Sequence, residues 1–394
     1  MTPVYLDNNA TTRVDPRVLE AMLPMFSGVF GNPSSAHSFG ASAKTAVATA
    51  REQVRALIGA AHADEIVFTS GGTESDTLAI LGALAATAGA GGATTGRSEV
   101  VISAVEHPAV RKLCASLTKT RGIVVHEIGV DGRGRIDRDA YAAALSERTA
   151  LVSIMWANNE TGTIFPVADL AAQAKDKGAL FHTDAVQAVG RLPFGVAERM
   201  IDLLSLSGHK LGAPKGVGAL YVRRGVRLGA QTIGGAQERG RRAGTENVPG
   251  IVALGAACAL AAERLPSDTP RIAALRDSLE TGLFARIAEA KVLGDPDSRV
   301  ANTTSIAFAD VESEAVVRLL DRRGIAVSSG SACAAGSVEP SHVVRAMGVL
   351  EQFARGVVRF SLSRDTTADE IARTIDCVSD VIADLRADAL DPAA

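Results

Sequence analysis

Cysteine is scarce in this sequence, and its spacing excludes two common uses of the residue. The 394 residues contain four cysteines, and no two of them form a C-x-x-C pair. Neither a disulfide framework nor a zinc site matches this pattern. Each cysteine must therefore be interpreted by itself. Cys114, Cys258 and Cys377 lie in helical stretches with apolar periodicity, where we expect small hydrophobic side chains that pack.

The sequence also lacks an excess of charge of one sign. Its formal net charge is -3. Lysine and arginine are scattered, apart from a short cluster at Arg239, Arg241 and Arg242. Proteins that bind nucleic acid usually carry a basic patch or stripe, so nucleic acid is not an expected partner.

Long apolar runs are missing as well. No uncharged stretch approaches the roughly 20 apolar residues that cross a bilayer, so we expect no membrane association. The first residues, M-T-P-V-Y-L-D-N-N-A, have neither the basic start nor the apolar centre of a signal peptide. A cytoplasmic protein is the expectation.

What is present is the composition of an ordinary globular protein, with 47% hydrophobic and 22% charged residues. The length exceeds the roughly 100–200 residues expected for one domain. The pattern of the sequence changes near Gly250, where long Ala-rich stretches begin. We expect a large domain over residues 14–250 and a smaller domain formed by residues 1–13 and 251–394.

Short apolar runs alternate with longer amphipathic stretches over the first 250 residues. Runs that are apolar on both faces indicate central strands of a parallel sheet with helices on each side. The sequence therefore predicts an α/β fold with a mainly parallel central sheet, plus a smaller α+β domain. The expected strands are Glu65 to Phe68, Val100 to Ser103, Leu151 to Met155, Leu180 to Thr183, Leu203 to Ser205 and Gly218 to Val222.

Other elements are expected from simpler patterns. Two helical stretches, Ile251 to Arg264 and Pro270 to Ala288, precede strand-like segments near Ser305 to Phe308 and Val357 to Ser361. The Ala, Gly and Thr stretch from Ala83 to Gly96 is expected to be a surface loop. Its G-A-G-G-A-T string precedes a strand instead of following one, which disfavours a nucleotide-binding loop.

Polar residues gather where the predicted strands end. Ligands in open α/β sheets bind beyond the carboxyl ends of the strands, so we expect these ends to converge on one pocket. The polar residues concerned are S-G-G-T-E-S-D from Ser70 to Asp76, Glu106 and His107, Asn158 to Glu160, Asp184 and Gln187, and Ser207 to Lys210.

These residue types suit a cofactor that carries a phosphate. Gly71 and Gly72 allow an anion to approach the backbone closely, and Thr73 with the amides that open the following helix can bind it. Pyridoxal phosphate requires a lysine for a Schiff base and a carboxylate that keeps its ring nitrogen protonated. Lys210 and Asp184 form such a pair.

Three histidines and a serine are candidates for supporting roles. Ser207 and His209 can supply further donors to a phosphate, and His107 can stack on a cofactor ring. Strand alternation in F-H-T-D puts His182 and Asp184 on one face, so His182 is a candidate to support that end of the site.

Each feature also has a commoner explanation. A lysine in G-H-K is usually a solvated surface charge, and Lys215 lies nearby as a rival. Asp184 alone is typical of a helix N-cap, and S-G-G-T alone is typical of a turn. The joint occurrence at successive strand ends favours a cofactor site, although the residues alone leave both interpretations open.

Motifs along nearly the whole chain resemble those of the cysteine desulfurases. These motifs are Y-L-D-N-N-A-T-T (Tyr5 to Thr12), G-N-P-S-S (Gly31 to Ser35), T-S-G-G-T-E-S-D (Thr69 to Asp76), E-H-P-A-V (Glu106 to Val110), N-N-E-T-G (Asn158 to Gly162), H-T-D-A-V-Q-A-V-G (His182 to Gly190), S-G-H-K-L-G-A-P-K-G (Ser207 to Gly216), R-R-A-G-T-E-N (Arg241 to Asn247) and S-S-G-S-A-C (Ser328 to Cys333). The resemblance implies an aminotransferase-like (fold type I) pyridoxal-phosphate enzyme. It also implies a homodimer that converts L-cysteine to L-alanine and passes the sulfur to an iron–sulfur scaffold protein.

By position, the resemblance implies a role for each residue of the expected pocket. Lys210 resembles the Schiff-base lysine, His107 the ring-stacking acid/base and Asp184 the partner of the ring nitrogen. Arg359 resembles the arginine that clamps the substrate carboxylate. The remaining implied contacts are Gln187 and Asn159 near the ring hydroxyl and the substrate carboxylate, and Gly72, Thr73, Ser207, His209 and, from the second subunit, Thr245 around the phosphate.

Cys333 differs from the other cysteines because it lies in S-S-G-S-A-C-A-A-G-S, a run of small residues. A nucleophile that attacks sulfur over the cofactor and then presents a persulfide to an acceptor needs such a mobile segment. The resemblance implies that Cys333 is this nucleophile and that its persulfide can bind a cluster iron transiently. The loop resembles that of the longer-looped desulfurases rather than the selenocysteine-lyase-like group.

Among the longer-looped desulfurases, the residues of these motifs most resemble those of the nitrogen-fixation type, which implies a sulfur supply for nitrogenase clusters. A housekeeping role in iron–sulfur assembly is the alternative. The departures from the family pattern are Ala236, Asp365 and the long stretch from Ala83 to Gly96, and none touches a residue assigned to chemistry. A β-lyase or aminotransferase would need no cysteine in such a loop, and a non-catalytic sulfur carrier would be expected to lack Lys210 or Asp184.

Overall fold

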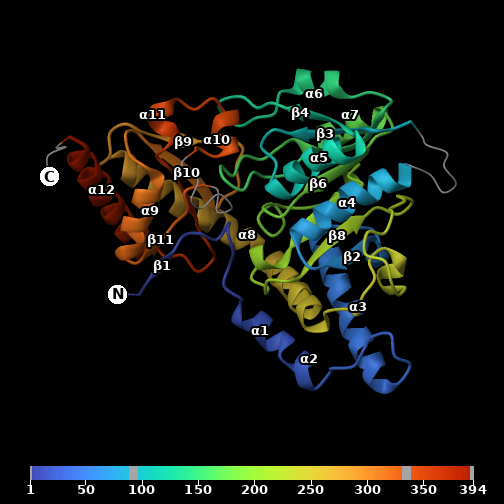
Figure 1. Ribbon diagram of the computed structural model, residues 1–394. Helices are drawn as coiled ribbons and strands as arrows, with labels where there is room; N and C mark the ends of the chain where they lie inside the picture. The colour runs from blue at the N-terminus through green and yellow to red at the C-terminus, as the bar shows by residue number, and fades with distance from the viewer. Residues whose placement is uncertain (1, 88–95, 331–338, 391–394) are drawn as a thin grey trace.

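The computed structural model describes residues 2–87, 96–330 and 339–390 (Figure 1). These residues form a seven-stranded, a three-stranded and a two-stranded sheet. The seven-stranded sheet has the order β2-β8-β7-β6-β5-β3-β4. Its strands are β2 (Ile66–Thr69), β3 (Glu99–Ser103), β4 (Val124–Ile128), β5 (Thr149–Ser153), β6 (Leu180–Asp184), β7 (Leu203–Ser207) and β8 (Gly218–Val222).

The prediction of a mainly parallel sheet is confirmed. All neighbours from β7 through β6, β5 and β3 to β4 run parallel, and β8 runs antiparallel to both β7 and β2. The predicted strands all form, with ends shifted by a residue or two. β4 was not predicted. It lies at the sheet edge, where only Ile128 of its five residues is buried, so His126 and Glu127 interrupt the apolar pattern.

Helices cover both faces of this sheet, as expected. Side chains alternate between the faces of a strand, and accordingly Val101 belongs to a different core cluster from Val100 and Ile102. The cluster around Val100 packs on α4 (Gly72–Thr87) and α5 (Pro108–Arg121). The cluster around Val101 packs on α3 (Ser38–Ile58), α6 (Arg138–Ala144), α7 (Val167–Asp176) and the first half of α8 (Val248–Phe284).

A separate apolar core joins the two ends of the chain. Val4 and Leu6 pack there with residues from Ile272 to Ile382. The strands around this core are β1 (Val4–Tyr5), which pairs parallel with β11 (Ile325–Ala326), and the antiparallel sheet of β9 (Ala290–Leu293), β10 (Thr303–Phe308) and β12 (Val357–Ser361). The helices of this part are α9 (Ser313–Arg322), α10 (His342–Ala346), α11 (Glu351–Ala354) and α12 (Ala368–Leu390).

α8 links the cores as one helix of 37 residues, where the sequence predicted two helical stretches. Pro266 and Pro270 lie inside it and are both exposed, so the carbonyl groups that they leave unpaired can be hydrated. By length and composition alone, α8 could cross a membrane, but 56% of its most apolar window is buried inside the structure. Packing against α3 identifies it as a core helix.

The expected loop from Ala83 to Gly96 is wrong over its first five residues. α4 continues to Thr87, so Ala83 to Thr87 are helical, and residues 88–95 lie outside the described part of the chain. Alanine favours helix, and burial of Ala83 and Leu84 against the sheet extends α4 through a stretch whose composition alone resembled a loop.

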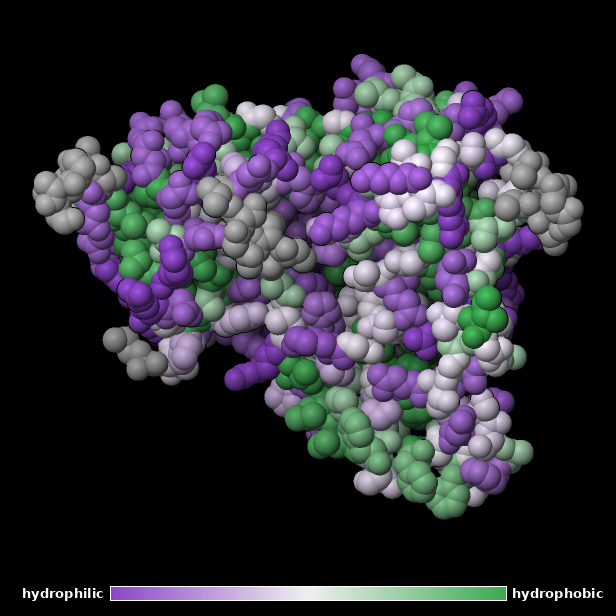
Figure 2. All heavy atoms as spheres, viewed as in Figure 1, coloured by the Kyte–Doolittle hydropathy of each residue, from purple (hydrophilic) through white to green (hydrophobic). Residues whose placement is uncertain are grey.

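Several large apolar side chains are exposed over the two short helices α1 (Pro16–Met22) and α2 (Pro24–Ser27) and the start of α3. Figure 2 shows them as a hydrophobic region at the lower end of the molecule. We call this region the α1–α2 apolar surface. Its exposed members are Leu19, Leu23, Phe26, Phe30 and Phe39.

The contact of α8 with α3 depends on a glycine. A Cβ atom added to Gly255 would lie 2.6 Å from the Cα atom of Ala50. We expect Gly255→Ala to separate the two helices and to lower the free energy of unfolding by about 1–3 kcal/mol, as overpacking does. Chemical denaturation measures the change. Gly129→Ala is the control, because a Cβ atom there meets nothing within 4 Å. Equal midpoints for the two variants would contradict the prediction.

Candidate active site

Ten of the residues that were given an individual role from the sequence line one cavity of about 270 Å³. The cavity lies at the carboxyl ends of the central strands, as the strand-end argument predicted. The predicted residues that line it are Gly72, Thr73, His107, Asn159, Asp184, Gln187, Ser207, His209, Lys210 and Arg359. The rival lysine, Lys215, is exposed and does not line this cavity.

One end of the cavity is built to receive an anion. Gly71 has φ +156°, and a Cβ atom on Gly72 would lie 2.9 Å from Val186 Cγ2. Glycine at these two positions therefore keeps the backbone accessible to an anion. The first amides of α4 have no acceptor within the helix and point toward this end. Ser207 and His209 border the same cavity. Burial lowers the pKa of His209 to about 4, so His209 is neutral at pH 7.

Asp184, the last residue of β6, supplies a buried carboxylate. Its Oδ1 accepts a hydrogen bond from the Val186 amide at 2.9 Å. Burial raises the pKa of Asp184, while His107 and Lys210 both lower it by favouring the charged form. A carboxylate in this position suits a protonated ring nitrogen.

A second buried carboxyl group, Asp76, lies beside Asp184, and the sequence analysis gave it no individual role. One ligand atom each of Asp76, His107 and Asp184 lie within 4.8 Å of one another. Oδ1 of Asp76 has no hydrogen-bond partner among the described residues. Burial, and after it the Asp184 charge, raises the pKa of Asp76 well above its usual value, which favours the neutral form of Asp76.

His107 is the N-cap of α5, and its Nδ1 accepts a hydrogen bond from the Ala109 amide at 3.2 Å. This contact places the ring proton on Nε2. Burial lowers the pKa of His107, which favours a neutral ring in the cavity. A neutral imidazole of this kind can stack on a cofactor ring and can still exchange a proton.

His182 lies behind the cavity wall, where it supports the site from the sheet. Its ring nitrogens contact Ser153 Oγ at 2.8 Å and Ser205 Oγ at 2.9 Å. The Nε2 atom is also 3.7 Å from Asp76 Oδ1. Burial lowers the pKa of His182 to about 3, so this pair is not ionic.

Lys210 ends the short 3-10 helix η3 (Gly208–Lys210) that follows β7. Its Nζ donates to the carbonyl oxygens of Asn9 at 2.5 Å and Ala10 at 2.6 Å. Burial, Arg191 and Arg359 lower the pKa of Lys210 to about 7. A lysine amine that is half neutral at physiological pH is suited to nucleophilic and proton-transfer chemistry.

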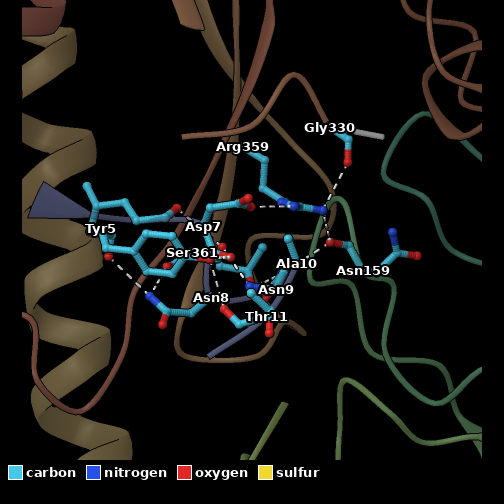
Figure 3. Close-up of polar contacts among 12 residues, drawn as sticks. Tyr5, Asp7, Asn8, Asn9, Ala10, Thr11, Asn159, Gly330, Arg359 and Ser361 are labelled. Carbon is cyan, nitrogen blue, oxygen red and sulfur yellow. Dashed lines mark hydrogen bonds and ion pairs between the residues drawn. The ribbon is translucent and has the colours of Figure 1, made fainter. Parts of the chain in front are cut away.

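Arg359 in β12 also lines the cavity, and Figure 3 shows it among its polar partners. It is 2% exposed. Nη2 forms an ion pair with Asp7 Oδ1 at 2.7 Å, and Nη1 donates to the carbonyl oxygens of Asn159 and Gly330, both at 2.9 Å. Nε has no partner among the described residues. This N–H is a buried donor that lacks an acceptor, as expected where a ligand completes the site.

The N-terminal segment contributes more to the site than the sequence suggested. Asn9 accepts at its carbonyl oxygen from Lys210 and from Gln187 Nε2, the latter at 3.0 Å. The Asn9 side chain donates to Asn159 O at 3.1 Å and to Thr303 Oγ1 at 2.9 Å. The sequence motif around Asn9 was recognised, but the type of a residue does not predict that its backbone carbonyl group accepts hydrogen bonds in the site.

Two selected residues are not in the cavity. Thr245 is exposed and does not line it, which leaves open the expected contact from a second subunit. Cys333 lies within residues 331–338, outside the described residues. The other cysteines are helical as expected, in α5, α8 and α12, with Cys114 and Cys258 buried and Cys377 half-buried.

Comparisons with known proteins identify the family of the chain. The family model for aminotransferase class-V matches residues 4–374. The chain therefore belongs to the class-V aminotransferase family, which confirms the predicted fold-type I architecture and implies pyridoxal phosphate as the cofactor.

Curated relatives define the activity more closely. The chain is 60% identical over 386 residues to a cysteine desulfurase of Gluconacetobacter diazotrophicus, covering 98% of this chain and 95% of the relative. It is 53% identical over 386 residues to the cysteine desulfurase NifS of Azotobacter vinelandii, covering 98% and 94%. A solved structure described as a NifS-like protein is 36% identical, with a TM-score of 0.90 over 98% of this chain and 100% of that chain. Within its family this chain is a cysteine desulfurase.

The titration of Lys210 can be measured in the cofactor-free protein. Because its pKa is lowered to about 7, we expect the rate of amine modification at Lys210 to rise through neutral pH and then level off. Mass spectrometry of the peptide that contains Lys210 measures the rate, and Lys210→Arg removes the signal. A rise centred near the ordinary lysine pKa of about 10.4 would contradict the prediction.

Proposed function

We propose that Lys210 holds pyridoxal phosphate and that Cys333 accepts the substrate sulfur as a persulfide. The observation that carries this proposal is the convergence of Lys210, Asp184 and Arg359 on one cavity. The donors fit the cofactor: the amides of α4, Thr73, Ser207 and His209 suit the phosphate, and Asp184 suits the ring nitrogen. The remaining contacts would be His107 against the ring and Gln187 and Asn159 near its hydroxyl.

Bound pyridoxal phosphate supplies an electron sink for the substrate α-carbon. Arg359 binds the substrate carboxylate through its free Nε–H, with Asn159 beside it. The lowered pKa of Lys210, about 7, allows its amine to take the α-proton and return it at a neighbouring carbon. His107, whose lowered pKa favours a neutral ring, also lines the cavity and can exchange protons there.

The Cys333 thiolate then takes the sulfur. A bond forms between the two sulfur atoms while the carbon–sulfur bond of the substrate breaks. The electron pair left on carbon is protonated, so that alanine leaves and the enzyme keeps a persulfide. The buried cysteines are poor alternatives, because burial raises the pKa of both Cys114 and Cys258 to about 12.

The sulfur is proposed to go to an iron–sulfur scaffold protein in the cytoplasm, and the Cys333 persulfide to bind a cluster iron transiently. Similarity to the NifS of Azotobacter vinelandii supports a supply for nitrogenase clusters, and the housekeeping role is the second candidate. Neighbouring nitrogenase genes would favour the first role, and a general cluster-assembly operon would favour the second. A non-catalytic carrier is disfavoured, because Lys210 and Asp184 both line the cavity.

We also propose a homodimer in which Thr245 completes the phosphate site of the other subunit. The α1–α2 apolar surface supports this proposal, because exposed clusters of large apolar side chains mark interaction sites. The proposed domain division, with residues 14–250 in the large domain and residues 1–13 and 251–394 in the small one, is supported by the separate core around Val4, Leu6 and Phe360.

Replacement of the proposed sulfur acceptor separates sulfur transfer from binding. We expect Cys333→Ser to bind pyridoxal phosphate and L-cysteine normally but to lose at least about 100-fold in sulfide and alanine formation, because a hydroxyl is a far poorer nucleophile than a thiolate. Sulfide release with a reductant and alanine formation measure the loss. Cys114→Ser, Cys258→Ser and Cys377→Ser are the matched controls and should keep substantial activity. A Cys333→Ser variant that works at the wild-type rate, or makes pyruvate, would replace this mechanism by that of a β-lyase.

Charges on the α1–α2 apolar surface should dissociate the dimer. We expect a Phe26→Asp, Phe30→Asp double variant to sediment as a monomer and to bind pyridoxal phosphate about tenfold or more weakly, since Thr245 of the second subunit is lost. Leu350→Asp is the control, because Leu350 is also exposed but lies outside this surface. A fully active wild-type monomer at working concentration would disprove the proposal.

A further inference from the structure

The proposed function gives no role to Asp7, whose carboxylate contacts the arginine of the site. Asp7 follows β1 and forms the 2.7 Å ion pair with Arg359 Nη2. It is the carboxylate in contact with this guanidinium among the described residues. Figure 3 shows Asp7, Asn159 and Gly330 arranged around Arg359. Nη1 and Nη2 are thus engaged, while Nε remains free.

The Asp7 carboxylate is not required to hold the N-terminal segment in place. Backbone hydrogen bonds already join this segment to β12, from the Asn8 amide to Ser361 O at 3.1 Å and from the Ser361 amide to Leu6 O at 2.7 Å. The Asn8 side chain adds a hydrogen bond to Ser361 O at 2.8 Å. The carboxylate therefore has a use other than docking the segment.

The charges around Asp7 show what the carboxylate does. Lys210, Arg191 and Arg359 are close enough for the two arginines to lower the pKa of Lys210, and Asp7 and Asp184 oppose them. Arg359 is almost completely buried, and a buried arginine that loses its carboxylate reorients or takes up an anion from solvent. A reoriented guanidinium would no longer meet the carboxylate of a substrate, and a bound anion would compete with it.

We propose that Asp7 is a positioning residue that fixes Arg359 so that its Nε–H faces the carboxylate of the amino-acid substrate. Asp7 thereby determines the selectivity of the site for ligands that carry this carboxylate. The inference rests on the proposed function of Arg359. It assigns Asp7 no contact with the cofactor and no proton transfer.

The test uses the pyridoxal-phosphate-loaded protein and the isosteric variant Asp7→Asn. We expect KM for L-cysteine to rise about tenfold or more while kcat changes less than about threefold, since binding rather than chemistry is lost. Cysteamine, which is cysteine without its carboxylate, should perturb the visible absorbance of variant and wild type at equal concentrations. The affinity for pyridoxal phosphate should stay unchanged.

A second readout needs no cofactor. Because Asp7 raises the pKa of Lys210, Asp7→Asn should lower that pKa below its wild-type value of about 7. Amine modification of the cofactor-free protein at a series of pH values measures the shift. Asp15→Asn is the matched control, since Asp15 also pairs with arginines, Arg264 and Arg364, but lies outside the cavity. It should change neither KM nor the titration of Lys210.

The outcomes separate this inference from the proposed function. If Arg359→Ala keeps the wild-type KM for L-cysteine, Arg359 does not bind the carboxylate and the proposed function is wrong at that residue. If Arg359→Ala loses selectivity over cysteamine but Asp7→Asn keeps it, only the role of Asp7 is wrong. An equal loss of both ligands in Asp7→Asn would indicate general damage and would also overturn the inference. Should Asp7→Asn not fold, Asp7→Glu, which moves the carboxylate by one methylene, carries the same test.

Discussion

The site depends on the hydrogen bonds that the N-terminal segment makes to residues from distant parts of the chain. The carbonyl oxygens of Asn9 and Ala10 receive the Lys210 amine, and the Asn9 side chain reaches Asn159 and Thr303. The same segment is bonded to β12, which carries Arg359. One short turn after β1 therefore links the lysine at the end of β7 to the arginine of the smaller sheet. Because the groups involved are buried and hydrogen-bonded, this arrangement is costly to distort.

The charges in the cavity follow from the same packing. Burial lowers the pKa of Lys210 and raises those of Asp184 and Asp76, so each group is moved toward its neutral form. The coulombic effects of His107 and Lys210 partly offset the rise in the pKa of Asp184, whereas the Asp184 charge adds to the rise at Asp76. A neutral His182 lies behind them, hydrogen-bonded to two serines. The cavity can therefore present a buried carboxyl group and a titratable amine, which is the combination that a pyridoxal-phosphate enzyme uses.

Sequence reasoning predicted the parts of this arrangement that follow from local patterns. Apolar runs gave the central strands, and polar residues at their ends, such as Asp184 and Lys210, gave the cavity. Arg359 was found only through family resemblance, because a single arginine in a buried strand carries no local signal. Asp76 and Asn9 were missed as site residues for different reasons: Asp76 lies inside a helix where acidic residues are usually solvated, and Asn9 acts largely through its backbone. The edge strand β4 and the continuous helix α8 were missed because tertiary contacts outweigh composition there.

Different parts of the chain supply the groups for the cofactor and the groups for the substrate, and this arrangement suits sulfur transfer. The large sheet contributes the groups that suit the cofactor, while β12 and the N-terminal segment contribute those that suit the substrate carboxylate. Arg359 also contacts the carbonyl oxygen of Gly330, three residues before Cys333 in the sequence. The group proposed to bind the substrate carboxylate is thus attached to the chain that leads to the proposed sulfur acceptor. In L-cysteine the carboxylate and the sulfur are on neighbouring carbons, so fixing the carboxylate at Arg359 restricts the sulfur to positions near that chain. An arginine that contacted another part of the chain could bind the carboxylate equally well, but it would not link the substrate to the segment that leads to Cys333.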